Sequence, residues 1–246
     1  MLCPNHHLLP CSLLLLSFFI TPHPDRIRHK LGAFPATDGS AYMEIGLNKV
    51  LVVVTGPMEP RRAADALSDK AFISVHLSTA AFSGNDHKKR RLNDRRSLDM
   101  ESVLRKTFEG TVMLEQYPRS EIHITVHLIE SDGSVICALI NAVTLALMDA
   151  GVSMVDMVTA CSVGQVRGKF CADVNQVEQN AGGAYLPLAV RARSEEILFL
   201  QLDSRLSIDL FGDALDVALE GCRRMRTYME ASTKRCIEEA FAAQRL

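Results

Sequence analysis

The densest cluster of chemically active side chains is the basic segment Lys88-Lys-Arg-Arg-Leu-Asn-Asp-Arg-Arg96, which holds six cations in nine residues. Guanidinium and ammonium groups bind phosphate oxygens, so such a segment can hold a nucleic-acid backbone. The alternative is a solvated, charge-rich loop, which is the commoner case for an arbitrary basic run. Because the net charge is −2, any affinity for RNA must come from local patches of this kind.

A second candidate is the pair His123 and His127, whose spacing on a helix would suit one metal ion. The surrounding segment Glu121–Leu128 alternates strictly between apolar and polar residues, which predicts a strand instead. At about 3.3 Å per residue the two imidazoles stand ~13 Å apart, too far to share an ion. The seven cysteines contain no Cys-x-x-Cys pair, so we expect no metal site and reduced thiols.

A hairpin is the clearest structural element that the sequence predicts. Asp38-Gly39 opens it, Ala41–Ile45 is extended, Gly46-Leu47-Asn48 turns, and Lys49–Thr55 returns to Gly56-Pro57. Other predicted strands are Ala71–Leu77, Glu121–Leu128, Met154–Val166, Ala184–Val190 and Ile197–Leu202. Predicted helices are Arg96–Leu114 with Asp94 or Ser97 as N-cap, a buried helix Ala138–Ala150 closed by Gly151, and Leu210–Ala243. This order predicts a two-layer α/β (α+β) domain.

Taken in order, these patterns resemble the RNase PH family of phosphorolytic 3′→5′ exoribonucleases and their exosome ring relatives. The similarity is greatest to exosome core subunits of the ribosomal-RNA-processing protein 41 type. It is carried by Asp38–Pro57, Lys88–Arg96, Asp132-Gly133-Ser134, Asn141–Gly151, and Asp173-Val174-Asn175 before Gly182-Gly183. The resemblance implies one RNase PH-like domain over residues 26–246, with the β-α-β-β fold that is like domain 2 of ribosomal protein S5.

Phosphorolysis of RNA requires a group that orients inorganic phosphate, such as a bidentate guanidinium or helix N-terminal amides. Active members of the family carry a Gly-Gly-Thr-Arg-like turn for this purpose. Here the turn reads Asp132-Gly133-Ser134-Val135, and valine can neither donate a hydrogen bond nor carry charge. The resemblance therefore implies a degenerate phosphate site, in which Ser134 and the turn amides attract an anion only weakly.

The leaving 3′ oxygen must be protonated, or stabilised by a metal that an acidic side chain holds. Active relatives carry two aspartates six positions apart; here Asp173 is kept but the second position is the neutral Gln179. The resemblance thus predicts a ring subunit without catalytic residues or a cofactor. The alternative is an active phosphate-dependent 3′→5′ exoribonuclease, in which Glu178 and Ser134 replace the lost groups and inorganic phosphate, with or without Mg²⁺, takes part.

The resemblance assigns RNA binding to four arginines. Arg95 and Arg96 match positions that hold the phosphates of the entering strand, and Arg61 and Arg62 match the neck of the central pore more loosely. Aromatic residues are scarce, with no Trp and four Tyr, so we expect backbone contacts to dominate over base stacking.

The expected partners are other RNase PH-like exosome subunits in a hexameric ring, RNA-binding cap subunits and single-stranded RNA. The expected setting is rRNA maturation and mRNA turnover in the nucleus, nucleolus and cytoplasm, without a membrane.

Residues 1–25 form an atypical N-terminal extension. Leu13–Ile20 is long enough for a signal-peptide core but short of the roughly 20 residues that span a bilayer. No Lys or Arg precedes it, and no small-x-small cleavage site precedes Thr21. These features favour an alternative or mispredicted start over a secretion signal, and a secreted protein is the third, weakest reading.

Overall fold

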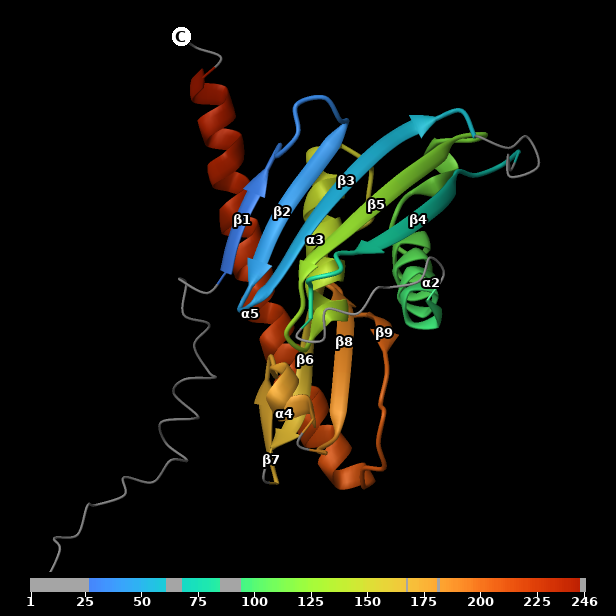
Figure 1. Ribbon diagram of the computed structural model, residues 1–246. Coiled ribbons are helices and arrows are strands. Elements are labelled where there is room, and N and C mark those ends of the chain that lie inside the picture. The colour runs from blue at the N-terminus through green and yellow to red at the C-terminus, as the bar shows by residue number, and fades with distance from the viewer. Residues whose placement is uncertain (1–26, 61–67, 85–93, 167, 181, 244–246) are drawn as a thin grey trace, which may run out of the picture.

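Two separate sheets organise the computed structural model, which describes residues 27–60, 68–84, 94–166, 168–180 and 182–243 (Figure 1). Among the strands in these ranges, only β4 and β5 pair in parallel, and the other pairings are antiparallel. The five-stranded sheet has the order β1 (Ile27–Leu31), β2 (Gly39–Ile45), β3 (Asn48–Met58), β5 (Glu121–Glu130) and β4 (Phe72–Thr79). The four-stranded sheet has the order β7 (Lys169–Ala172), β6 (Val158–Val166), β8 (Tyr185–Arg191) and β9 (Ile197–Leu200).

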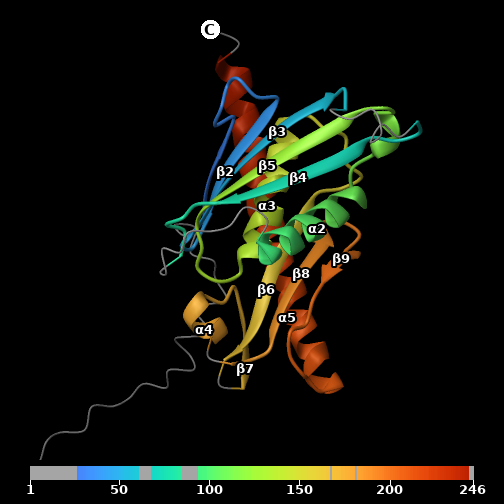
Figure 2. The same cartoon turned by 45° about the vertical axis from the view of Figure 1, so that its right-hand side comes forward.

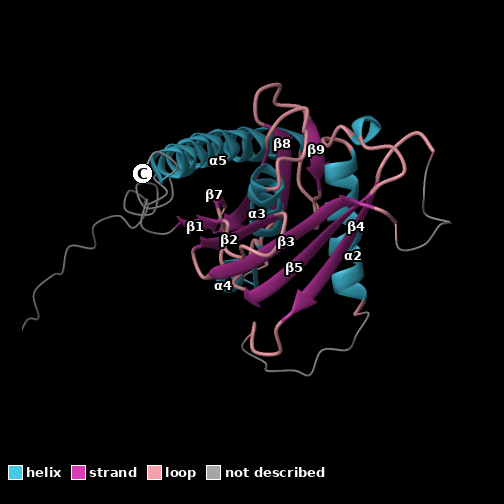
Figure 3. Ribbon diagram, turned by 90° about the horizontal axis from the view of Figure 1, so that it is seen from above, coloured by secondary structure: helices cyan, strands magenta, loops and turns pink. Residues whose placement is uncertain are grey.

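The helices join and cover these sheets. Seen from above, α3 lies between α5 and α2 (Figure 3). None of the helices within the described ranges is long and apolar enough to cross a membrane. The helical elements are α2 (Arg95–Glu109), the 3₁₀ helix η3 (Leu114–Gln116), α3 (Val135–Asp149), α4 (Gln176–Asn180) and α5 (Ile208–Ala243).

Helix α3 forms the centre of the main core. It is buried from Cys137 to Leu147 and packs against both sheets, so it is apolar nearly all round, as the sequence predicted. Its C-terminus closes as predicted at Gly151, which has φ +68°. The Gly151 N–H donates to Met148 O at 3.2 Å and the Val152 N–H to Leu147 O at 3.1 Å, which is the Schellman arrangement.

The predicted hairpin is confirmed as β2 and β3, joined at Gly46 with φ +59°. Its two ends are tied together, because the Gly56 N–H donates to Asp38 Oδ2 at 2.8 Å. The valines at alternate positions of β3 (Val50, Val52 and Val54), together with Ile122 and Ile124 of β5, are fully buried in the main core. This alternation confirms the two-residue periodicity on which the strand predictions depended.

Several element boundaries differ from the sequence prediction. The predicted helix Arg96–Leu114 ends at Glu109, and the chain then turns at Gly110 and enters η3. The predicted strand from Met154 begins only at Val158, while Met154 forms a single bridge to Val112. Strands β1 and β7 and the short α4 were not predicted, since each is too short for a clear periodic pattern.

Candidate functional site

The turn that precedes α3, residues 132–134, is held in place by hydrogen bonds to Asn48, the first residue of β3. The Asp132 N–H donates to Asn48 Oδ1 at 2.8 Å, and Asn48 Nδ2 donates to Gly133 O at 2.8 Å. Gly133 and Ser134 are both left-handed, with φ +65° and +49°. A Cβ on Gly133 would lie 2.5–2.7 Å from backbone atoms of residues 174–176, so the turn packs directly on that loop.

The Ser134 hydroxyl is used inside the protein. It donates to Val174 O at 2.7 Å and lies 2.5 Å from Ser162 Oγ, which must then be the donor in that pair. Ser134 is only 3% exposed, so its single proton is not available to an anion. Val135 is buried and Ile136 is half-buried, and because both side chains are aliphatic the first two positions of α3 carry no charge.

Asp173 and Gln179 are separated by a loop and most of a helix turn. Asp173 follows β7 with φ +57°, is exposed, and donates its N–H to Ser162 O at 2.8 Å. Gln179 lies in α4, where its N–H donates to Asn175 O at 2.9 Å. The loop 174–176 therefore packs directly on the turn, while Gln179 lies further along α4.

Glu178 has a structural role that the sequence analysis missed. Its Oε2 accepts the Asn175 N–H at 3.0 Å, while Asn175 Oδ1 accepts the Glu178 N–H at 2.9 Å. This reciprocal pair is a capping box at the start of α4. The signal was present as Asn175-x-x-Glu178, but it was interpreted only as a candidate acid. The carboxylate that the catalytic alternative requires is thus engaged in holding α4.

Asp132 adds a second link between the turn and α4, since its Oδ1 accepts the Gln176 N–H at 3.2 Å.

Two titratable side chains near the turn, the half-buried Tyr185 and the buried Cys137, are neutral. Burial raises the pKa of Tyr185, with Cys137 and Asp173 adding to the rise, and burial raises the pKa of the Cys137 thiol well above its usual range. Neither side chain supplies a charged base or nucleophile at neutral pH.

The predicted RNA-binding arginines fall in two regions. Arg95 and Arg96 begin α2 and are both exposed. Asp94 is the N-cap residue, as one of the two predictions had it, although its side chain makes no capping hydrogen bond. Arg61 and Arg62 lie outside the described residues, as do residues 85–93, which hold the rest of the basic segment.

The two histidines lie on β5, as predicted. His123 Nδ1 is 2.8 Å from Ser74 Oγ, which donates to Glu121 Oε1 at 2.6 Å, so His123 donates to Ser74. His127 is exposed. Within the described ranges, no three His, Cys, Asp or Glu residues gather in a way that could hold a metal ion.

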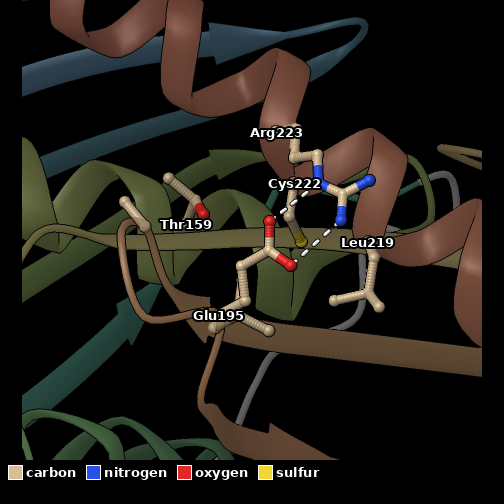
Figure 4. Close-up of a pocket in the computed structure, with 7 residues that line it drawn as sticks. Thr159, Glu195, Leu219, Cys222 and Arg223 are labelled. Atoms are coloured by element: carbon tan, nitrogen blue, oxygen red, sulfur yellow. Dashed lines mark hydrogen bonds and ion pairs between the residues drawn. The ribbon is translucent and has the colours of Figure 1, made fainter.

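The pocket between β6, β8 and α5 is too small for a substrate (Figure 4). Its volume is about 10 Å³, close to the lower limit for one water molecule. Arg223 donates two hydrogen bonds to Glu195 at 2.8 and 2.9 Å across its mouth, and the Thr159 hydroxyl is buried without a partner in the described chain. This arrangement is suited to a trapped water.

A larger cleft of about 270 Å³ lies between β4 and α2, lined by Phe72, Ser74, Val75, Leu98, Glu101, Ser102 and Arg105. The acidic residue of this cleft, Glu101, is also used in an internal hydrogen bond. Glu101 Oε1 accepts the Leu77 N–H at 2.7 Å and lies 3.5 Å from His76 Nδ1. This carboxylate therefore holds α2 against the edge strand β4.

Comparison with known proteins gives the class to which this site belongs. Residues 26–153 match domain 1, and residues 156–221 match domain 2, of the 3′ exoribonuclease family called RNase PH. The chain belongs to this family, which confirms the resemblance and the mixed α/β fold inferred from the sequence.

Among the relatives, Exosome complex component RRP41 of Mus musculus is 41% identical over 216 residues, which cover 87% of this chain and 88% of the mouse protein. The crystal structure of rice (Oryza sativa) Rrp46 has a TM-score of 0.75 at 20% identity, over 85% of this chain and 94% of that one. The Archaeoglobus fulgidus exosome with RNA bound to the active site gives 0.72 at 17% identity, over 89% and 99%. These two structures share the fold.

Proposed function

We propose that this chain is a non-catalytic, RNA-binding core subunit of an RNA exosome, supporting 3′→5′ RNA processing and degradation. The names of its relatives support membership of that complex. The observation that carries the non-catalytic assignment is the commitment of Ser134 and Glu178 to internal hydrogen bonds. These are the two groups that would have to replace the missing arginine and aspartate.

The local chemistry supports this proposal. An incoming phosphate needs a cation or free donors, and the start of α3 offers the aliphatic side chains of Val135 and Ile136. Asp132 instead brings a negative charge to the turn, which disfavours a second anion there. Of the two positions that the resemblance assigns to acids, only Asp173 is a carboxylate that could transfer a proton to the leaving oxygen, because Gln179 cannot titrate.

The proposed partners are other RNase PH-like subunits in a hexameric ring, cap subunits and single-stranded RNA, in the nucleus and cytoplasm. Strand β9 is the edge of the four-stranded sheet, and Ile197, Leu200 and Leu202 near it are 37–47% exposed. Such an edge is suited to being covered by a neighbouring subunit. Size-exclusion chromatography with light scattering, with and without co-purified partners, tests this arrangement.

The alternative, an active phosphate-dependent exoribonuclease, is favoured by one observation. Asp173 is exposed, and it matches the first of the two aspartates that active members of the family carry. The deciding measurement is the release of nucleoside diphosphates from single-stranded RNA by the assembled complex, with and without inorganic phosphate. We expect Asp173→Ala to leave any release unchanged. A phosphate-dependent release that Asp173→Ala abolishes would show that this chain is the catalyst.

Restoring the missing groups tests the same site from the other direction. Gln179→Asp combined with Val135→Arg should recover part of the activity if only those groups are missing. Since Val135 is buried, the matched pair Gln179→Asp with Ile136→Arg places the cation at the more exposed neighbouring position. Recovery is limited by geometry, because catalytic groups must lie within roughly 0.5 Å of their productive positions.

A further inference from the structure

Phe82 is the most exposed aromatic residue in the part of the chain that the structure describes. Its exposed fraction is 65%, whereas Phe34 is 43% exposed and the described tyrosines are at least half-buried. Covering a large apolar ring is favourable, so the surroundings of Phe82 decide what kind of partner could cover it. The question is which partner.

The loop that carries Phe82 is fixed beside the turn before α3. Ser83 is 2% exposed, and its carbonyl accepts both the N–H of Ser131 at 2.9 Å and its hydroxyl at 3.0 Å. The Ser83 N–H donates to Ala80 O at 3.1 Å and closes the loop on itself. With Ser83 buried and bonded to Ser131, the neighbouring Phe82 is left exposed on a loop fixed beside the end of β5.

The same end of the sheet carries the start of α2. Glu101 of α2 bonds to Leu77 of β4, while Arg105, further along α2, lines a cleft with Phe72, earlier in β4. Helix α2 therefore runs antiparallel to β4 and begins beyond the point where β4 ends. Figure 2 shows the end of β4 and the start of α2 on the same side of the molecule. Arg95 and Arg96 are thus exposed on the side toward which the chain carries Phe82.

We propose that Phe82 is a base-stacking residue for single-stranded RNA whose phosphates are held at the start of α2. Proteins that bind single strands combine cations that follow the backbone with aromatic rings on which bases stack. An exposed ring on an anchored loop, on the side of the molecule that also carries two exposed arginines, meets both requirements. This inference rests on the proposed RNA-binding function and adds to it a contact with the bases, which backbone binding alone does not include.

The test compares Phe82→Ala with Phe82→Tyr and Phe82→Leu in the assembled complex. Phe34→Ala is the matched control, because Phe34 is also an exposed ring but lies at the opposite end of the five-stranded sheet. It is in the loop between β1 and β2, whereas the Phe82 loop bonds to Ser131, which follows β5 at the end of the sheet that holds the Gly46 turn (Figure 1). The probes are oligoadenylate, oligouridylate and an abasic oligomer of equal length. Each is titrated at several salt concentrations, and co-purifying subunits are counted for each variant.

We expect Phe82→Ala and Phe82→Leu to weaken oligoadenylate binding by about 5- to 150-fold, the range for one base on one ring. The affinity for oligouridylate should fall less, and the affinity for the abasic oligomer should not change. The salt dependence should also stay the same, because no phosphate contact is removed. Phe82→Tyr and Phe34→Ala should bind as the wild type does. Equal losses for the abasic oligomer, no loss for any RNA, or loss of partner subunits on Phe82→Ala would overturn the stacking role. Failure of the wild-type complex to bind RNA would overturn the proposed function itself.

Discussion

The starts of α3 and α2 use their polar groups in opposite ways. At the start of α3, the Ser134 hydroxyl faces the protein and donates to Val174, and the neighbouring side chains are aliphatic. At the start of α2, Arg95 and Arg96 are exposed, and the side chain of the N-cap residue Asp94 makes no capping hydrogen bond. Both are helix N-termini that a nucleic acid or phosphate could approach. They differ in what covers them, since the loop 173–176 packs on the first.

In the proposed function, this difference separates catalysis from RNA binding. Turnover requires several groups within a few tenths of an ångström, so the proposed function attributes its absence to the missing arginine and aspartate. Binding to a strand requires only exposed charge and apolar surface, which tolerate variation in geometry. A chain can therefore lose one function and keep the other.

The strongest test of the closed site is Gly133→Ala. The new Cβ would lie 2.5–2.7 Å from backbone atoms at φ +65°, and the loop 174–176 cannot yield as a flexible side chain would. We expect a loss of roughly 3 kcal/mol or more in the free energy of unfolding, measured by urea denaturation. Gly46→Ala is the matched control, because Gly46 has φ +59° with open space around it, and should cost about 1–2 kcal/mol.

A similar loss for the two glycine variants would mean that the turn is not packed on the loop as tightly as the distances indicate. The site would then have room for an anion, and the contrast between α3 and α2 would weaken. A much larger loss for Gly133→Ala would confirm that the covering loop is part of the structural core.

The exposed side of the comparison is tested by Arg95→Ala/Arg96→Ala. Removing two phosphate contacts should flatten the slope of log affinity for single-stranded RNA against log salt by ~1.4, at about 0.7 per contact. The loss should be nearly equal for different homopolymers, because phosphate contacts carry no base information. Filter binding at several salt concentrations measures both quantities in the assembled complex.

The matched control for the arginines is Arg223→Ala/Arg224→Ala on α5. Both of these arginines are paired with glutamates, at 2.8 Å to Glu195 and 3.0 Å to Glu220. This double change removes the same charge from another surface, so its slope should equal that of the wild type. If both double variants flatten the slope alike, net charge and not a local site explains the binding.

Sequence reasoning was accurate where a long pattern determined structure. The buried helix at Ala138–Ala150 and the hairpin at Asp38–Pro57 are both confirmed, because their periodicity and turn residues point the same way. It was least informative for single polar residues. Asn48 and Ser134 each bond to a segment far away in the sequence, which only the fold brings within reach, whereas Glu178 bonds to Asn175 three residues before it. The Asn175-x-x-Glu178 signal was readable, but a five-residue helix gave it no context.

The smallest expected effect concerns His29, a half-buried side chain that joins β1 to α5. Tyr228 Oη donates to Ile27 O at 2.8 Å, so it must accept the Nδ1–H of His29 at 3.0 Å. Nε2 then accepts the hydroxyl proton of Ser232, and the neutral imidazole has all of its hydrogen bonds. Burial lowers the pKa of His29, and Arg235 lowers it further.

Because the folded pKa of His29 lies below its unfolded value of about 6.5, the unfolded chain binds the proton more readily. The free energy of unfolding should therefore fall as the pH decreases through about 6.5, and this contribution should level off below the folded pKa. Urea denaturation of the wild type and His29→Gln at about pH 7.5 and 5.5 measures it, since other groups titrate equally in both. The difference between the two chains should shrink at the lower pH. A difference that stays constant would mean that His29 titrates alike in the folded and unfolded chain, and that its contacts with Tyr228 and Ser232 do not depend on its charge.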